Sequence, residues 1–262
     1  MSLIRQPAVA GAFYPADPKK LHEMMQHYLN ESKTTEKVPK AIIVPHAGYI
    51  YSGPIATTAY ARLQNSHDSI TRVVLLGPSH RVGFQGLAVC SADTFATPLG
   101  NIPVDTESVQ SIAQLPYVQY IDQAHLMEHS LEVHLPFLQE VLDSFSLVPI
   151  VVVGDATAEQ VSEILELLWG GPETLIVISS DLSHYHDYAT ARQMDKATSE
   201  HIEALQYEQL DYESACGRVP ICDLLALARK KSLHVKTIDL RNSGDTAGDK
   251  SRVVGYGAYV VD

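Results

Sequence analysis

Short runs of apolar, mostly β-branched residues alternate along the chain with longer segments that carry apolar residues at helical spacing. The runs predict strands at Ala41–Val44, Arg72–Leu76, Leu87–Cys90, Leu147–Val153, Leu175–Ile178 and Arg252–Val261. Several of these runs are continuously apolar, which is typical of strands that are covered on both faces. The segments between them predict helices at Lys19–Asn30, Ile55–Gln64, Thr106–Gln114, Leu131–Leu142, Thr157–Trp169, Thr190–Leu205 and Ile221–Lys231. This alternation predicts an α/β fold, a three-layer α/β/α sandwich around a largely parallel or mixed central sheet, with residues 1–262 forming one domain.

Polar residues follow three of the predicted strands at the point where each strand ends. The first strand runs into a Pro-His pair that contains His46, and the second runs into a Gly-Pro-Ser-His turn that ends at His80. The strand at 175–178 is followed by Asp181 and then by His184. Ligands of open parallel sheets bind beyond the carboxyl ends of the strands. If these three strands are parallel neighbours, the four side chains converge on one cleft.

The residue types in this predicted cleft suit a metal site. Neutral imidazole is a ligand for Fe, Zn, Cu and Ni. Two histidines and one carboxylate leave positions open for substrate and dioxygen at Fe(II), or for a water molecule at Zn(II). A further histidine that does not bind metal can act as a general acid or base near neutral pH. The competing interpretation is that each loop histidine only forms a hydrogen bond with a carbonyl group.

Two other polar segments contribute candidates. In the first, Glu128 and His129 lie near a predicted helix start and are expected to reach the cleft, whereas His134 is expected to be a buried core histidine. The zinc-protease pattern H-E-x-x-H is absent. In the second, the Gly-rich loop Asn242–Asp249 lacks the Gly-Lys-Ser/Thr of a P-loop. It is either a plain turn or the place from which Asp245 supplies the missing carboxylate.

Composition narrows the choice of partners and compartment. The chain has 262 residues, 45% of them hydrophobic, and a net charge of −12, so it can bury a sizeable core. It has no basic run, which argues against nucleic acid and anionic membranes as partners. We find no signal peptide and no apolar run long enough to span a bilayer, and the three cysteines form no C-x-x-C pair, so we expect a cytoplasmic protein. Cys90, Cys216 and Cys222 are interpreted as small buried apolar residues.

Several motifs, taken together and in order, resemble the Memo family over nearly the whole chain. They are Arg5-Gln-Pro-Ala-Val-Ala-Gly-Ala-Phe-Tyr-Pro15, Pro45-His-Ala-Gly-Tyr49, Gly77-Pro-Ser-His80, Glu128-His-Ser-Leu-Glu-Val-His-Leu-Pro136 and Ser179-Ser-Asp-Leu-Ser-His184. The prokaryotic branch of this family is also called the B component of the AmmeMemoRadiSam system. The resemblance therefore implies a radical-SAM protein and an AMMECR-type protein as partners.

The resemblance also implies a fold like that of the class III extradiol dioxygenases, which open catechol-type rings with Fe(II) held by two histidines and a carboxylate. By position, His46 and His80 match the metal-binding histidines, His184 matches the acid/base histidine of the pocket, and Asp181 matches its companion. The animal Memo protein completes its metal site with a cysteine in the late loop. Here that loop has Ser243, Gly244 and Asp245, and Cys216 and Cys222 lie upstream of it. Asp245 is accordingly predicted to be the third ligand.

Three hypotheses follow for the function. The first is a dioxygenase-like oxidoreductase with Fe(II), in which His184 moves a proton, Asp181 orients it, and Tyr49 and Tyr185 line a pocket for a small aromatic substrate. The tyrosines would otherwise be ordinary packing residues. The second is a non-enzymatic protein that binds a peptide, copper or iron on the same fold. The third is a Zn-dependent hydrolase.

Overall fold

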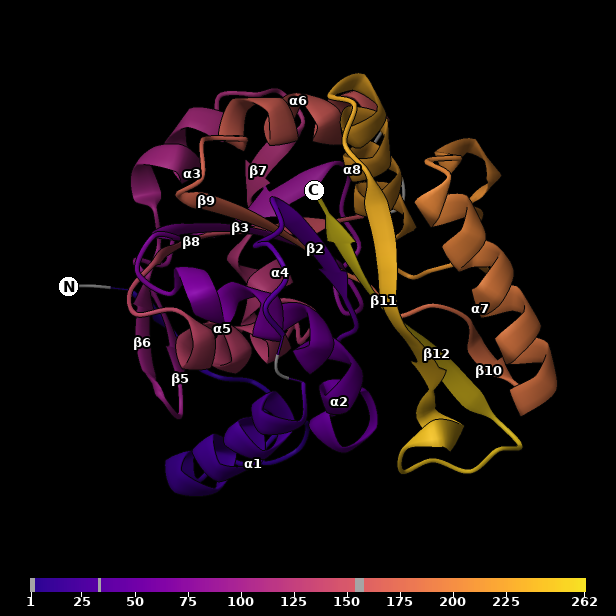
Figure 1. The fold of residues 1–262 in the computed structure, drawn as a ribbon. Coiled ribbons are helices and arrows are strands. Elements are labelled where there is room, and N and C mark those ends of the chain that lie inside the picture. Colours follow the sequence, from indigo (N-terminus) through magenta and orange to yellow (C-terminus); the bar gives the residue numbers. More distant parts are fainter. Residues whose placement is uncertain (1–2, 33, 154–157) are drawn as a thin grey trace.

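A nine-stranded mixed sheet lies at the centre of the computed structural model, which describes residues 3–32, 34–153 and 158–262 (Figure 1). Its strands are β2 (Ala41–Val44), β3 (Arg72–Pro78), β4 (Leu87–Val89), β7 (Val118–Tyr120), β8 (Ser146–Val152), β9 (Thr174–Ser179), β10 (His184–His186), β11 (Val235–Asn242) and β12 (Val253–Val261). The strand order is β10-β12-β2-β9-β3-β8-β4-β7, and β11 pairs with β12 outside this path. A smaller sheet is formed by β1 (Ile4–Arg5), β5 (Thr94–Thr97) and β6 (Gly100–Pro103).

The four central strands β2, β9, β3 and β8 are parallel to one another. Every residue of β2 and β9 is buried, and so is every residue of β3 and β8 except the first. Antiparallel pairs close this parallel core, with β12 against β2 and β4 against β8. The predicted α/β class with a mixed central sheet is therefore confirmed, and the continuously apolar runs mark the strands that both helical layers cover.

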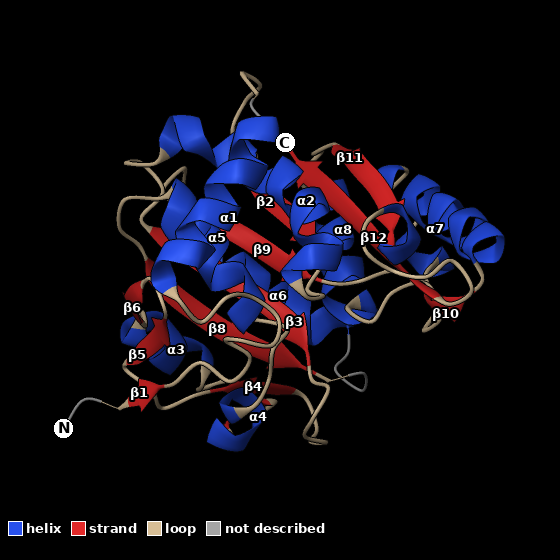
Figure 2. Cartoon of the chain, turned by 90° about the horizontal axis from the view of Figure 1, so that it is seen from below, coloured by secondary structure: helices blue, strands red, loops and turns tan. Residues whose placement is uncertain are grey.

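Helices lie on both faces of the sheet (Figures 1 and 2). One layer contains α1 (Pro18–Glu31), α2 (Tyr49–Tyr60) and α5 (Leu135–Val141), which contact one another; the other contains α3 (Thr106–Ile112), α6 (Ala158–Leu168) and α8 (Arg218–Lys230). The short α4 (Asp122–Leu126) contacts β4, and α7 (Tyr188–Glu203) packs on β11 and β12. Among the described helices, none combines the length and apolar character needed to cross a membrane.

Two of the predicted helices differ from the observed helices near a proline. Pro54 was expected to precede its helix, but α2 begins at Tyr49 and continues through Pro54. Eight of its twelve residues are buried, so tertiary packing offsets the backbone hydrogen bond that a proline within the helix removes. The segment predicted as Leu131–Leu142 is divided into the 3-10 turn Glu132–His134 and α5, which has Pro136 at its start. The first residue of the helix predicted from Thr157 lies outside the described residues.

The carboxyl group of Glu132 anchors the N-terminal segment beside the sheet. It accepts hydrogen bonds from the backbone amides of Ala8 (2.7 Å) and Val9 (3.0 Å) and from the hydroxyl of Tyr14 (2.6 Å), and it pairs with the Arg5 guanidinium. Arg5 also donates to two carbonyl groups of the segment before Glu132. A single buried acid thus binds the start of the chain to the segment that carries Glu128 and His129.

Candidate metal centre

Three neighbouring strands bring the candidate residues to one edge of the sheet. β9 lies between β2 and β3 and is parallel to both. His46, His80 and Asp181 each stand two residues beyond the last residue of their strand. Because the carboxyl ends of parallel strands face the same edge, the shared register places these three side chains together. The parallel arrangement on which the predicted convergence depended is present.

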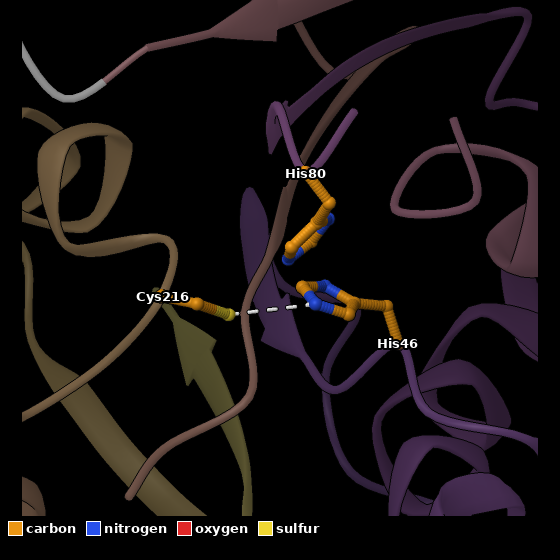
Figure 3. A group of neighbouring side chains, drawn as sticks. All are labelled: His46, His80 and Cys216. Atoms are coloured by element: carbon orange, nitrogen blue, oxygen red, sulfur yellow. Dashed lines mark hydrogen bonds between the residues drawn. The ribbon is translucent and has the colours of Figure 1, made fainter. Parts of the chain in front are cut away.

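The rings of His46 and His80 meet the sulfur of Cys216 at this edge (Figure 3). Their ring centroids are 5.1 Å apart in an edge-to-face arrangement, and Cys216 Sγ lies 3.4 Å from His46 Nε2. One ligand atom from each of the three residues lies within 4.8 Å of the others. Two imidazoles and a thiol from three separate segments therefore converge on a space that one ion could occupy.

Cys216 corrects one prediction. The sequence predicts a small buried apolar residue at this position, but its sulfur lies against the His46 ring. In the structure it lies in the loop before α8, and this loop packs directly on the end of β9. Gly217 permits the contact, since a Cβ atom there would be 2.5 Å from the carbonyl oxygen of Ser179. Cys90 and Cys222 are buried, as expected.

The His46 ring is held from behind by polar groups of β9 and its following loop. Its Nδ1 atom lies 2.7 Å from Ser179 Oγ, and its backbone amide donates to Asp181 Oδ1 over 2.8 Å. The second carboxylate oxygen of Asp181 lies 3.9 Å from His46 Nε2, on the side of the ring that faces Cys216. Only the Nε2 atom of His46 is thus directed toward the candidate metal position.

Glu128 holds His80 in a similar way. Its carboxylate lies 2.9 Å from His80 Nδ1 and also accepts hydrogen bonds from the backbone amides of His80, His129 and Ser130. Burial alone would raise the pKa of Glu128, but the hydrogen bonds from His80 and these amides outweigh it and lower the pKa to about 2. Glu128, His80 and His129 also lie close enough together to suggest a second ion site. However, the hydrogen bonds to Glu128 occupy both of its oxygens, so we interpret it as a group that orients His80.

Burial dominates the electrostatics of the centre. It lowers the pKa of His46 well below the usual value, and the nearby His80 adds to the effect. It raises the pKa of the Cys216 thiol to about 12 and that of Asp181 to about 7. The neutral imidazole of His46 can bind a cation directly, whereas the Cys216 thiol must lose its proton to do so. A soft thiolate with two imidazoles is a donor set that fits Fe, Zn or Cu.

The remaining predicted pocket residues differ in their burial and in their contacts with the centre. The His129 ring stacks on His80 at 4.6 Å and lies edge-on to His46 at 5.5 Å, so it is part of the site wall. His184 is half-buried and interacts electrostatically with both His46 and His80. Tyr185 beside it is 62% exposed, in the left-handed region at φ 64°, with Arg252 4.8 Å from its ring. Such strain in a non-glycine residue is frequent at functional sites.

Asp245 does not take the place predicted for it. Its carboxylate accepts hydrogen bonds from the Tyr188 hydroxyl (2.6 Å) and from the backbone amide of Asn242 (3.0 Å). The reason lies in the length of β12, in which Tyr259 pairs with Ile43 of β2. The first residue of β12 stands six positions earlier, roughly 20 Å further along the strand. The late loop that precedes β12 therefore lies well beyond the ends of β2 and β9.

Tyr49 was predicted to line the pocket, but the structure places it in the core. It is 1% exposed, its hydroxyl donates to the carbonyl of Val133, and its ring packs on Phe137 at 4.7 Å. Tyr49 begins α2 immediately after the His46 loop, and this helix turns the side chain inward. Glu128 is also too deeply buried to contact a substrate.

Two residues of the site were not found from the sequence. The sequence marks Ser179 only as the first residue of a motif that follows a strand, although its hydroxyl contacts His46. The Asp211–Gly217 segment has no apolar periodicity that would indicate where it packs. No local pattern therefore identified Cys216 as a residue of the candidate site. Its one clue is the Cys-Gly pair directly before a helix, because glycine permits close approach of the backbone to another segment.

Comparisons with known proteins agree with the family resemblance of the sequence motifs. The profile of the Memo-like protein family matches residues 5–260. A MEMO1 family protein of Aquifex aeolicus is 40% identical, with 97% of each chain covered. MEMO1 family proteins of Sulfolobus acidocaldarius and Archaeoglobus fulgidus are 37% and 35% identical, with at least 97% of each chain covered.

Proposed function

Because the chain belongs to the Memo-like protein family, we propose that it is a dioxygenase-like oxidoreductase with one metal ion, Fe(II), held by His46, His80 and Cys216. The observation that carries the proposal is the convergence of their three ligand atoms within 4.8 Å at the edge of the sheet. One-electron chemistry with dioxygen would come from the bound iron. Cys216 replaces the carboxylate that we predicted from Asp245.

The protein groups around this centre have distinct tasks. Ser179 and Glu128 orient the two imidazoles from behind. Burial lowers the pKa of His184, so its ring is neutral at pH 7 and can accept a proton from a substrate hydroxyl. Asp181, with its pKa raised to about 7 by burial, can hold a proton next to His46. Three protein ligands leave coordination positions open for a small aromatic substrate.

Metal analysis of protein purified without oxygen is the first test. We expect about one iron per chain in the wild type, at least 10-fold weaker retention in Cys216→Ser, and no change in Cys222→Ser. Cys222 is the matched control because its thiol is also buried but contacts the Tyr207 carbonyl instead of the site. Oxygen uptake with a panel of catechols then tests catalysis. Protein that retains no metal and consumes no oxygen would contradict the proposal.

A second function is favoured by the sulfur itself. Thiolate is a soft ligand that suits Cu(I) and Zn better than a carboxylate does. The same centre would then bind or store a metal without turnover, or would hold a Zn-bound water for hydrolysis. Copper or zinc in the purified protein, together with no oxygen uptake, would support this alternative over the oxidoreductase.

A further inference from the structure

The hydroxyl of Ser179 lies at the centre of a buried hydrogen-bond network behind the metal centre. Its oxygen is 2.6 Å from the carbonyl oxygen of Ser130, 2.7 Å from His46 Nδ1 and 2.8 Å from His134 Nε2. The four residues are at most 2% exposed. The positions of the protons in this network can therefore be worked out from the chemistry of its members.

A serine hydroxyl has one proton to donate and two lone pairs that accept. The carbonyl of Ser130 can only accept, so the proton of Ser179 points to it. Both imidazoles must then donate to the same oxygen. This requires a proton on Nδ1 of His46 and a proton on Nε2 of His134.

The far side of His134 agrees with this assignment. When Nε2 carries the proton of a neutral ring, Nδ1 has a lone pair, and the hydroxyl of Tyr60 lies 2.9 Å from it as a donor. Burial lowers the pKa of His134 to about 3, so the ring is neutral near pH 7. Tyr60, His134 and Ser179 thus form a chain in which each donor has one acceptor.

The consequence for His46 is a fixed tautomer. With its proton on Nδ1, the ring presents the lone pair of Nε2 to Cys216 Sγ, 3.4 Å away. The hydrogen bond of one ring nitrogen determines which nitrogen can bind a metal. A ring with its proton on Nε2 would instead direct an N–H group at the metal position.

We propose that Ser179, supported by His134 and Tyr60, is a positioning residue that fixes His46 in its Nδ1–H tautomer before a metal ion binds. The inference rests on the proposed function only in taking His46 as a ligand. The carboxylate of Glu128 holds His80 in the same tautomer, with its proton on Nδ1. The two imidazoles of the centre are thus oriented by different chemistry, a neutral hydroxyl network for one and a charged acceptor for the other.

The direct test is the tautomer of His46 in metal-free protein. Long-range ¹H–¹⁵N correlation spectra of protein labelled with ¹⁵N-histidine distinguish the protonated ring nitrogen from the unprotonated one. Single His→Gln variants of His46 and His134 assign the signals. We expect Nδ1–H for His46 and Nε2–H for His134. A wild-type His46 with its proton on Nε2 would overturn the proposal.

Two variants test the cause. Ser179→Ala removes the acceptor, so we expect a mixture of His46 tautomers and a Co(II) affinity that is lower by about 10-fold to 100-fold. Tyr60→Phe keeps the packing and removes only the donor to His134, so we expect both effects in weaker form. Tyr259→Phe is the matched control, because this fully buried tyrosine bonds to Ser199, away from the centre.

The outcomes separate this inference from the proposed function. Spectra of Ser179→Ala and Tyr60→Phe that match those of Tyr259→Phe, with unchanged Co(II) affinity, would refute the positioning role. If Ser179→Ala fails to fold, Tyr60→Phe alone decides the question. The predicted wild-type tautomers in a protein that retains no iron and consumes no oxygen would support the positioning network and count against the oxidoreductase.

Discussion

Replacing Glu132 by glutamine is expected to destabilise the protein severely, although the two side chains have nearly the same shape. The carboxyl group is fully buried, and its partner Arg5 is 4% exposed at the side chain. Val9 N and Tyr14 OH donate to one carboxylate oxygen, while Ala8 N and the Arg5 guanidinium donate to the other. Each oxygen therefore receives two hydrogen bonds.

Glutamine cannot satisfy this arrangement in either orientation of its amide. One side would present an NH₂ group to two donors, and only the Tyr14 hydroxyl can turn to accept. The Arg5 guanidinium would lose its opposite charge in a buried position. Breaking a buried ion pair by removing one partner typically costs about 3–5 kcal/mol. At roughly 2–4 °C per kcal/mol for a chain of this size, the melting temperature should fall by about 6–20 °C.

Urea unfolding measures the loss of stability, and hydrogen exchange of residues 5–14 shows whether the N-terminal segment is released. Glu166→Gln is the control, because Glu166 pairs with Lys230 on the surface, where the two side chains are 44% and 69% exposed. An exposed pair of this kind contributes about 0–1 kcal/mol. If Glu132→Gln costs no more than this control, the buried carboxyl group is not the anchor that its hydrogen bonds indicate.

Four further changes test other parts of the structure. Asp245→Ala should leave iron content unchanged, and a loss of iron would reinstate Asp245 as a ligand. Glu128→Gln should weaken Co(II) binding by about 10-fold, since His80 loses its charged acceptor; titration followed by absorbance would show no change if Glu128 only fills space. Gly217→Ala should displace Cys216, because the added Cβ atom would lie 2.5 Å from the carbonyl oxygen of Ser179. We expect a lower free energy of unfolding and a lower Co(II) affinity. Wild-type values for both quantities would show that the loop tolerates the methyl group. Burial lowers the pKa of His125 to about 4. In the unfolded chain this histidine binds a proton near pH 6.5, whereas in the folded protein it stays neutral until about pH 4. The free energy of unfolding therefore decreases as the pH falls from about 7 to 4. Between pH 7 and pH 5, urea unfolding should show a stability loss about 2 kcal/mol smaller in His125→Gln than in the wild type, and equal losses would contradict the assigned shift.

The parts of the fold that local pattern determines were predictable. Continuous apolar runs identified β2, β3 and β9, and the polar residues that follow them gave His46, His80 and Asp181. The convergence of these residues required only that the strands be parallel neighbours. The end of each of these strands is visible in the local sequence. The polar residue just beyond each strand end was therefore enough to locate this half of the candidate site.

The other half depends on tertiary packing. Position along the chain suggested Asp245, but β12 extends beyond β2 and carries the late loop away from the centre. Cys216 comes from an irregular loop whose position is set by the close approach of Gly217 to Ser179. Tyr49 follows a site histidine directly, yet α2 turns it into the core. No periodic pattern records which way a loop packs or how far a strand extends past its neighbour.

The contact between Cys216 and His46 joins residues that are 170 positions apart. Both imidazoles are synthesised long before the thiol. If the proposed centre binds a metal ion, the nascent chain offers that ion only His46 and His80 until the loop before α8 has docked on β9. Metal retention would then depend on completed folding of the chain.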